Sequence, residues 1–102
     1  DEIRSETARL AGDSIEWLEE RGLLARTVTL KVRYSDFTTV TRSHSAHASR
    51  DRAALTARAV ELLDRTEAGL RPVRLLGVSV HNFVDPEQFQ THPSDWLPFD
   101  EE

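Results

Sequence analysis

Basic and hydroxyl side chains alternate with apolar ones along residues 27–34. The polar set is Thr27, Thr29, Lys31 and Arg33, and the apolar set is Val28, Leu30, Val32 and Tyr34. Successive side chains of an extended strand point to opposite faces, so each set occupies a face of its own. Cations and hydroxyls gathered on one solvated face are the groups that bind a phosphate backbone. Ordinary solvent exposure of these polar residues is the competing interpretation.

The charge distribution permits an anionic partner, although the whole chain has a net charge of −5. Residues 23–83 carry ten Lys and Arg against five Asp and Glu, a net charge of +5. Residues 1–22 have seven acids against three arginines (−4), and residues 84–102 have six acids and no Lys or Arg (−6). A basic centre between acidic ends is compatible with nucleic acid, which the total charge alone argues against.

Other site chemistries have little support in the sequence. None of the 102 residues is Cys, which excludes a disulfide scaffold and a thiolate nucleophile or metal ligand. His44 and His47 are three apart, but no carboxylate at ligand spacing accompanies them, so we expect no metal site. No Gly-rich phosphate loop or Ser nucleophile motif is present. Without a long apolar run or a signal-peptide pattern, we expect a cytoplasmic protein without membrane contact.

The elements that position these residues follow the order helix, two strands, helix, strand, tail. Apolar spacings of three, four and seven predict a helix over residues 2–21, which Gly22 ends. Ser35-Asp36 predicts a tight turn, so residues 37–45 form a second strand antiparallel to the first. We expect a second helix over about 50–66, capped by Ser49, and a third strand over 73–83. Three prolines and the lack of periodicity predict an acidic tail over 84–102.

Two amphipathic helices and a sheet with one apolar face predict an α+β fold for residues 1–83. A small antiparallel sheet of three to four strands would have both helices packed on one face. The opposite face, which carries Lys31 and Arg33, would then remain open to solvent. From the helices, we expect the core to contain Trp17, Leu55, Ala59, Leu62 and Leu63.

Three segments resemble a known family when they are taken in order. They are TVTLKVRYSDF at 27–37, the threonine-rich TVTRS at 39–43, and RPVRLLGV at 71–78, which closely resembles a family strand with an R-x-[IL]-[RK]-x-[ILV]-G-[VIL] pattern. With a helix between the second and third, their spacing resembles the little finger domain of the Y-family translesion DNA polymerases. The similarity covers about residues 5–83 and is greatest to the bacterial DNA polymerase IV branch.

The resemblance implies a non-catalytic domain that grips the backbone of primer–template DNA for an error-prone, lesion-bypass polymerase. The DNA contacts that it implies are Lys31, Arg33, Thr41, Arg42, Ser43, His44 and Arg74. Catalytic carboxylates and Mg²⁺ would belong to the palm domain of the parent enzyme, so we expect no catalytic residue, metal or cofactor in this fragment. Family members also have an upstream strand that we do not find here, which leaves a sheet edge that can pair with another copy.

A second function remains open beside DNA binding. Leu75, Ser79 and His44 stand where relatives often have Arg or Lys, and neutral imidazole supplies little charge. This pattern favours a protein-interaction domain in a catalytically inactive, Y-family-like adaptor of a translesion synthesis complex. The basic residues at the other matched positions favour DNA.

The tail carries its own candidate site. Trp96, Leu97 and Phe99 are large apolar residues in an acidic segment with three prolines. Family members often end in a short peptide that docks in the sliding clamp, and such residues are typical anchors for a partner's pocket. We expect these three either to bind the clamp or to fold back onto the domain.

Overall fold

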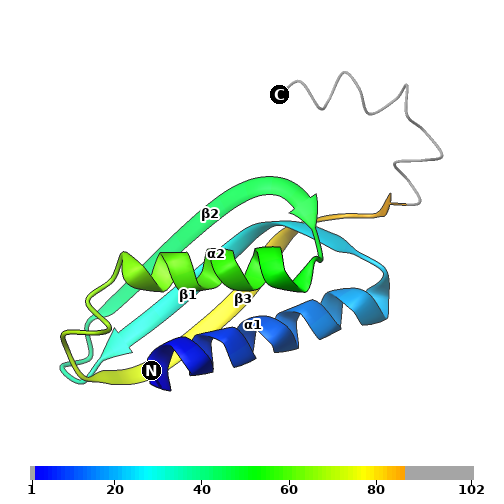
Figure 1. Ribbon diagram of the computed structural model, residues 1–102. Helices are drawn as coiled ribbons and strands as arrows, with labels where there is room; N and C mark the ends of the chain where they lie inside the picture. The colour runs from blue at the N-terminus through cyan, green and yellow to red at the C-terminus, as the bar shows by residue number, and fades with distance from the viewer. Residues whose placement is uncertain (1, 87–102) are drawn as a thin grey trace.

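The computed structural model describes residues 2–86. Its elements are α1 (Glu2–Arg21), β1 (Leu24–Tyr34), β2 (Thr39–Ser49), α2 (Arg52–Asp64) and β3 (Val73–Val84). The strands form one antiparallel sheet in the order β2-β1-β3, and both helices cover the same face of it (Figure 1). The predicted α+β fold is therefore confirmed, with three strands in the described part of the chain. Trp96, Leu97 and Phe99 lie outside the described residues.

The core lies between the helices and the apolar face of β1. Its main buried residues are Ala11, Ile15 and Leu18 of α1, Leu55, Ala59, Leu62 and Leu63 of α2, and Val28, Leu30, Val32 and Tyr34 of β1. Burying one such Val, Leu or Ile side chain stabilises a fold by about 1.5–3 kcal/mol, so this layer decides which sheet face stays open. Trp17 differs from the prediction, because it lies at the edge of the stripe and is 37% exposed.

The helix ends follow from local hydrogen bonds. Gly22 has a left-handed φ of 64°, and Leu23 N donates to Leu18 O at 3.0 Å, which closes α1 where the sequence predicts. The start of α2 differs from the prediction. Asp51 caps α2 by accepting from Ala54 N at 2.9 Å, whereas Ser49 still belongs to β2.

The β1–β2 turn has three residues instead of the predicted two. Tyr34 N donates to Thr38 O at 2.9 Å, and Phe37 N donates to Tyr34 O at 2.8 Å. Phe37 has a φ of 72°, in the left-handed position that closes such three-residue loops. Because a one-residue change of register turns every side chain to the other face, this extra residue determines which side of β2 faces solvent.

Candidate nucleic-acid interface

The sheet face opposite the helices, called the outer face below, is polar. Its residues are Thr27, Thr29, Lys31 and Arg33 of β1, their partners Thr39, Thr41, Ser43 and Ser45 of β2, and Leu75, Gly77, Ser79 and His81 of β3. The three strands together contain five Lys and Arg and no Asp or Glu. In contrast, α1 on the other side carries six acids and three arginines.

Cross-strand hydrogen bonds hold the hydroxyl groups of the outer face in place. Thr29 Oγ1 lies 2.8 Å from Ser43 Oγ, and Arg33 Nε donates to Thr39 Oγ1 at 3.0 Å. A hydroxyl has one hydrogen and two acceptor sites, so in the Thr29–Ser43 pair one hydrogen is used and the other can donate outward. The face thus presents fixed donors beside its cations.

The structure brings together four of the seven predicted contact residues. Lys31 pairs with Thr41, and Ser43 with Thr29, so these residues share the outer face with Arg33. Two further predicted contacts belong to β2. Arg42 pairs with Leu30, and His44 pairs with Val28. Those partners belong to the core, so Arg42 and His44 leave the sheet on the helix side, where both are exposed. The family resemblance had implied all seven residues as DNA contacts without assigning them to a face of the sheet.

Arg74 lies at the turn end of the sheet, where it lines a hollow with Leu75 of the outer face and with Glu2 and Glu6 of α1. Arg33 pairs with Leu75 but Tyr34 pairs with Val73, so Arg74 is bulged and has no partner in β1. Its guanidinium carbon lies 4.5 Å from the centroid of the Phe37 ring. Bulges commonly redirect a side chain, and this one directs Arg74 toward the β1–β2 turn.

The cations of this region are not neutralised. Within residues 2–86, neither Lys31 nor Arg33 nor Arg74 forms an ion pair, and their strands supply no carboxylate. Arg71 shows the opposite arrangement, since it pairs with Asp36 at 2.7 Å and Glu67 at 2.9 Å. An anion that approaches the outer face therefore meets charges that no carboxylate of the described chain already occupies.

Arg71 has a structural role next to this face. Its guanidinium carbon lies 4.1 Å from the centre of the Tyr34 ring, and the hydrogen bond to Glu67 raises the pKa of Arg71. Asp36 in turn accepts from the hydroxyl and backbone N–H of Thr38, and these hydrogen bonds lower the pKa of its carboxyl group. Arg71 therefore ties the β1–β2 turn to the loop before β3.

Arg58 is an important residue that the sequence interpretation missed. Its Nη2 donates to Arg26 O at 2.6 Å and to His44 O at 2.9 Å. These carbonyls lie at a register shift where residues 46–48 face Arg26 alone, so Arg58 replaces part of the lost ladder. Burial lowers its pKa, and its Nε has no partner in the described chain. Its position between Leu55 and Leu62 on the buried helical stripe was the available signal.

Comparison with known proteins shows the family of this chain. Residues 1–92 match the model of the impB/mucB/samB family C-terminal domain. The chain belongs to this family. The predicted relationship to the little finger domain of bacterial DNA polymerase IV is confirmed, because similar curated proteins carry the name DNA polymerase IV.

Three relatives illustrate the similarity of this impB/mucB/samB C-terminal domain to DNA polymerase IV. The sequence is 48% identical over 83 residues to DNA polymerase IV of Alkalilimnicola ehrlichii, which covers 81% of this chain and 23% of that protein. For Halorhodospira halophila the identity is 47% over 88 residues, covering 85% and 24%. For Streptomyces coelicolor it is 40% over 84 residues, covering 81% and 17%. The chain thus spans about a quarter of these relatives or less.

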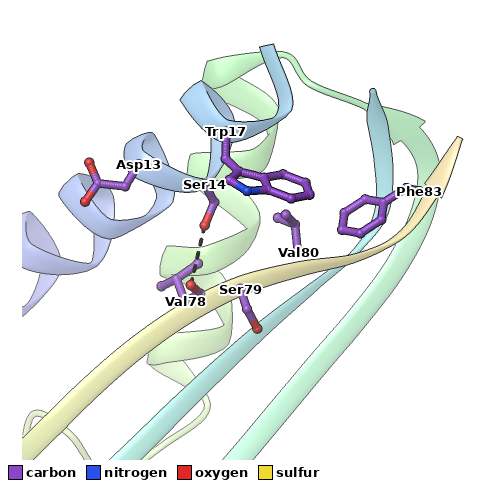
Figure 2. A pocket seen from close by; sticks show the side chains of 7 residues that line it. All are labelled: Asp13, Ser14, Trp17, Val78, Ser79, Val80 and Phe83. Carbon is purple, nitrogen blue, oxygen red and sulfur yellow. Dashed lines mark hydrogen bonds between the residues drawn. The ribbon is translucent and has the colours of Figure 1, made fainter. Parts of the chain in front are cut away.

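This impB/mucB/samB domain also has an open apolar groove between α1 and β3. Figure 2 shows Trp17 and Phe83 at one end of it, with ring centroids 5.2 Å apart, and Ser14 Oγ donating to Val78 O at 3.4 Å. Its volume is about 300 Å³. β3 is an edge strand of the described sheet, so a backbone edge runs beside the groove. An extended segment that adds to a sheet uses such an edge together with neighbouring side-chain pockets.

Two further observations concern residues 2–86 alone. No helix among them has the length and apolar character needed to cross a bilayer. Nor do His, Asp and Glu side chains in that range gather in threes where they could hold a metal ion.

Proposed function

We propose that this domain grips the phosphate backbone of duplex DNA with its outer face, as part of a lesion-bypass DNA polymerase. The observation that carries the proposal is the pairing of Lys31 and Arg33 with hydroxyl-bearing partners on a face without carboxylates. Charged hydrogen bonds to phosphate need cations that no carboxylate already pairs with. The names of the relatives support the polymerase as the parent protein.

The same residues favour backbone contacts over base recognition. Reading base edges in the major groove needs a protruding helix or two-stranded ribbon, whereas both helices here pack on the one face of the sheet that is opposite the outer face (Figure 1). Arg, Lys and hydroxyl donors on a broad face bind phosphates of any sequence. Neutralising about three phosphates gives weak binding that falls steeply with salt.

Polarity across the domain supports this orientation on DNA. The outer face carries Lys31 and Arg33 and no carboxylate, and α1 on the opposite side has twice as many acids as arginines. A duplex is therefore attracted to the sheet and repelled by α1. The domain supplies grip alone, and the catalytic carboxylates with their Mg²⁺ belong to the palm of the parent DNA-directed DNA polymerase.

Two partners are proposed besides DNA. Trp96, Leu97 and Phe99, which lie outside the described residues, would anchor the tail in the sliding clamp. The edge of β3 would pair with a further strand, either from the rest of a longer parent chain or from a second copy. The apolar groove beside that edge supplies room for side chains of the added strand.

An adaptor role is the second candidate, and one observation favours it. Leu75 lies on the outer face opposite Arg33 and is 42% exposed, where a basic residue would strengthen DNA binding. Leu offers no hydrogen-bond donor to a phosphate, whereas it can pack against the apolar centre of a protein interface. In that case the domain would belong to a catalytically inactive adaptor protein and would bind another protein of a translesion synthesis complex.

A titration of fluorescent primer–template duplex with the 102-residue chain separates the two functions. We expect weak binding at low salt, and we expect Lys31→Glu with Arg33→Glu to remove it while the melting temperature is kept. Leu75→Lys should strengthen binding if the outer face meets phosphates. If the unmodified 102-residue chain does not bind duplex at low salt, the proposed DNA grip is wrong and the adaptor role is favoured.

A further inference from the structure

Two irregularities of the backbone meet at the turn end of the outer face. Phe37 has a left-handed φ of 72°, and Arg74 is bulged out of register with β1. Left-handed backbone is uncommon for a bulky side chain. Together the turn and the bulge bring the Arg74 guanidinium to 4.5 Å from the Phe37 ring.

The turn itself does not need a phenylalanine. Asn and Gly adopt the left-handed conformation most readily, and Asn accepts it without an exposed apolar ring. Phe37 is 61% exposed and is not part of the core. The aromatic ring is therefore placed where the fold gains little from it, with one face directed at a cation.

The other two stacked arginines differ in their surroundings. Arg71 lies over Tyr34, but two carboxylates already pair with it. Arg21 lies 4.2 Å from the Trp17 ring, and Glu20 pairs with it at 3.6 Å. Within the described chain, Arg74 stacks on an aromatic ring but forms no ion pair with a carboxylate. The N–H groups at the edge of its guanidinium therefore remain available to a ligand.

From this contrast we infer that Phe37 is a positioning residue, which holds the Arg74 guanidinium for a DNA phosphate beside Lys31 and Arg33. The inference rests on the proposed DNA grip. A planar guanidinium stacked on a ring presents its N–H groups outward in one plane, in the fork that matches phosphate oxygens. Holding a flexible side chain beforehand lowers the entropy lost on binding.

A double-mutant cycle on duplex binding tests this role in the 102-residue chain. The variants are Phe37→Asn, Arg74→Ala and the two combined, measured by fluorescence anisotropy at low salt. We expect Phe37→Asn to lower affinity about two- to fivefold, the size of an exposed cation–π interaction. Combined with Arg74→Ala it should cost nothing further, because the ring acts through the guanidinium. The melting temperature of Phe37→Asn should equal or exceed that of the parent.

Two more variants separate the ring from the turn. Phe37→Tyr keeps an aromatic face and should keep the affinity, whereas Phe37→Leu keeps apolar bulk and should lose as much as Phe37→Asn. The Leu variant also carries the cycle if the Asn variant folds poorly. Arg21→Ala removes the cation of a stacked pair on α1 and should leave affinity within about twofold.

The outcomes distinguish this inference from the function on which it rests. Suppose the unmodified chain binds duplex, but the fold-losses of affinity from Phe37→Asn and Arg74→Ala multiply in the double variant. Phe37 then does not act through Arg74, and the inference is wrong. The same holds if Phe37→Leu binds as tightly as the parent. If the parent chain does not bind duplex at all, the proposed function fails and this inference fails with it.

Discussion

Arg42 of β2 is the register partner of Leu30, whose side chain is completely buried beneath the helices. The next residue of β1, Lys31, pairs with Thr41 and points to the other side of the sheet. Two arginines that the sequence suggested as companion DNA contacts, Arg33 and Arg42, are thus separated by the sheet itself. Reversing the charge of each one changes the net charge equally but alters different faces.

We therefore expect Arg33→Glu to weaken duplex binding much more than Arg42→Glu. Losing a hydrogen bond to a charged group costs about 1.5–3 kcal/mol, which corresponds to tenfold or more in affinity. Arg42→Glu should act through screened, longer-range repulsion alone and cost about twofold. Anisotropy titrations of both variants at one salt concentration provide the comparison. Equal losses would show that the two faces have been assigned wrongly.

The contact between Arg58 and the strands predicts a loss of stability. In Arg58→Met the apolar stem is kept, but the carbonyls of Arg26 and His44 lose their donor. A typical hydrogen bond contributes about 0.5–1.5 kcal/mol to stability, and 1 kcal/mol changes the melting temperature of a domain this size by about 4–8 °C, so we expect a fall of several degrees. Arg65→Met, at an exposed position just after α2, is the matched control. Identical thermal melts of the two variants would exclude this role.

The turn should make stability depend on acidity through Asp36. Hydrogen bonds from Thr38, aided by the charge of Arg71, lower the pKa of this carboxyl below its usual value near 3.9. A group whose pKa is lower in the folded state stabilises that state above the unfolded pKa. This stabilisation is lost as the pH falls through the folded pKa. Melting temperatures between about pH 5 and 2 should fall less steeply for Asp36→Asn than for the parent, and parallel curves would contradict the assignment.

Deleting residues 94–102 tests the proposed clamp contact of Trp96, Leu97 and Phe99. We expect the unmodified chain to bind the sliding clamp with micromolar affinity, about −8 kcal/mol. The deletion should remove this binding and leave the melting temperature almost unchanged. Burial of two or three such side chains supplies several kcal/mol, less the cost of ordering the tail. A melting temperature several degrees lower, with clamp affinity intact, would mean that these residues complete the domain's own core.

The sequence predicted the faces of β1 because apolar residues occupy every second position there. For β2 the same reasoning had little to work with, since Val40 is its one large apolar residue. Its faces depend on the turn, and Phe37 gives no sign of a left-handed position that Gly or Asn would usually mark. The register that follows from the three-residue turn places Arg42 and His44 on the opposite face from Lys31.

Contacts made at irregular positions were also beyond the sequence. The bulge at Arg74 and the register shift opposite Arg26 arise from how three strands fit together, and no local sequence pattern predicts them. Consequently the stacking of Arg74 on Phe37 was not predicted. The helix caps show the same limit on a smaller scale, because Ser49 and Asp51 are both good capping residues and the length of β2 selects the second.

The salt dependence of duplex binding tests the central claim most directly. Affinity of the 102-residue chain should be measured at several salt concentrations, with two duplexes of unrelated sequence and with the Lys31→Gln, Arg33→Gln variant, which removes two charges without adding repulsion. We predict that log affinity falls linearly with log salt, alike for both duplexes, and with a slope of about −3 for three neutralised phosphates. The double variant should show a slope shallower by about 2. Binding that ignores salt, or a double variant with the parent's slope, would contradict a backbone grip by the outer face.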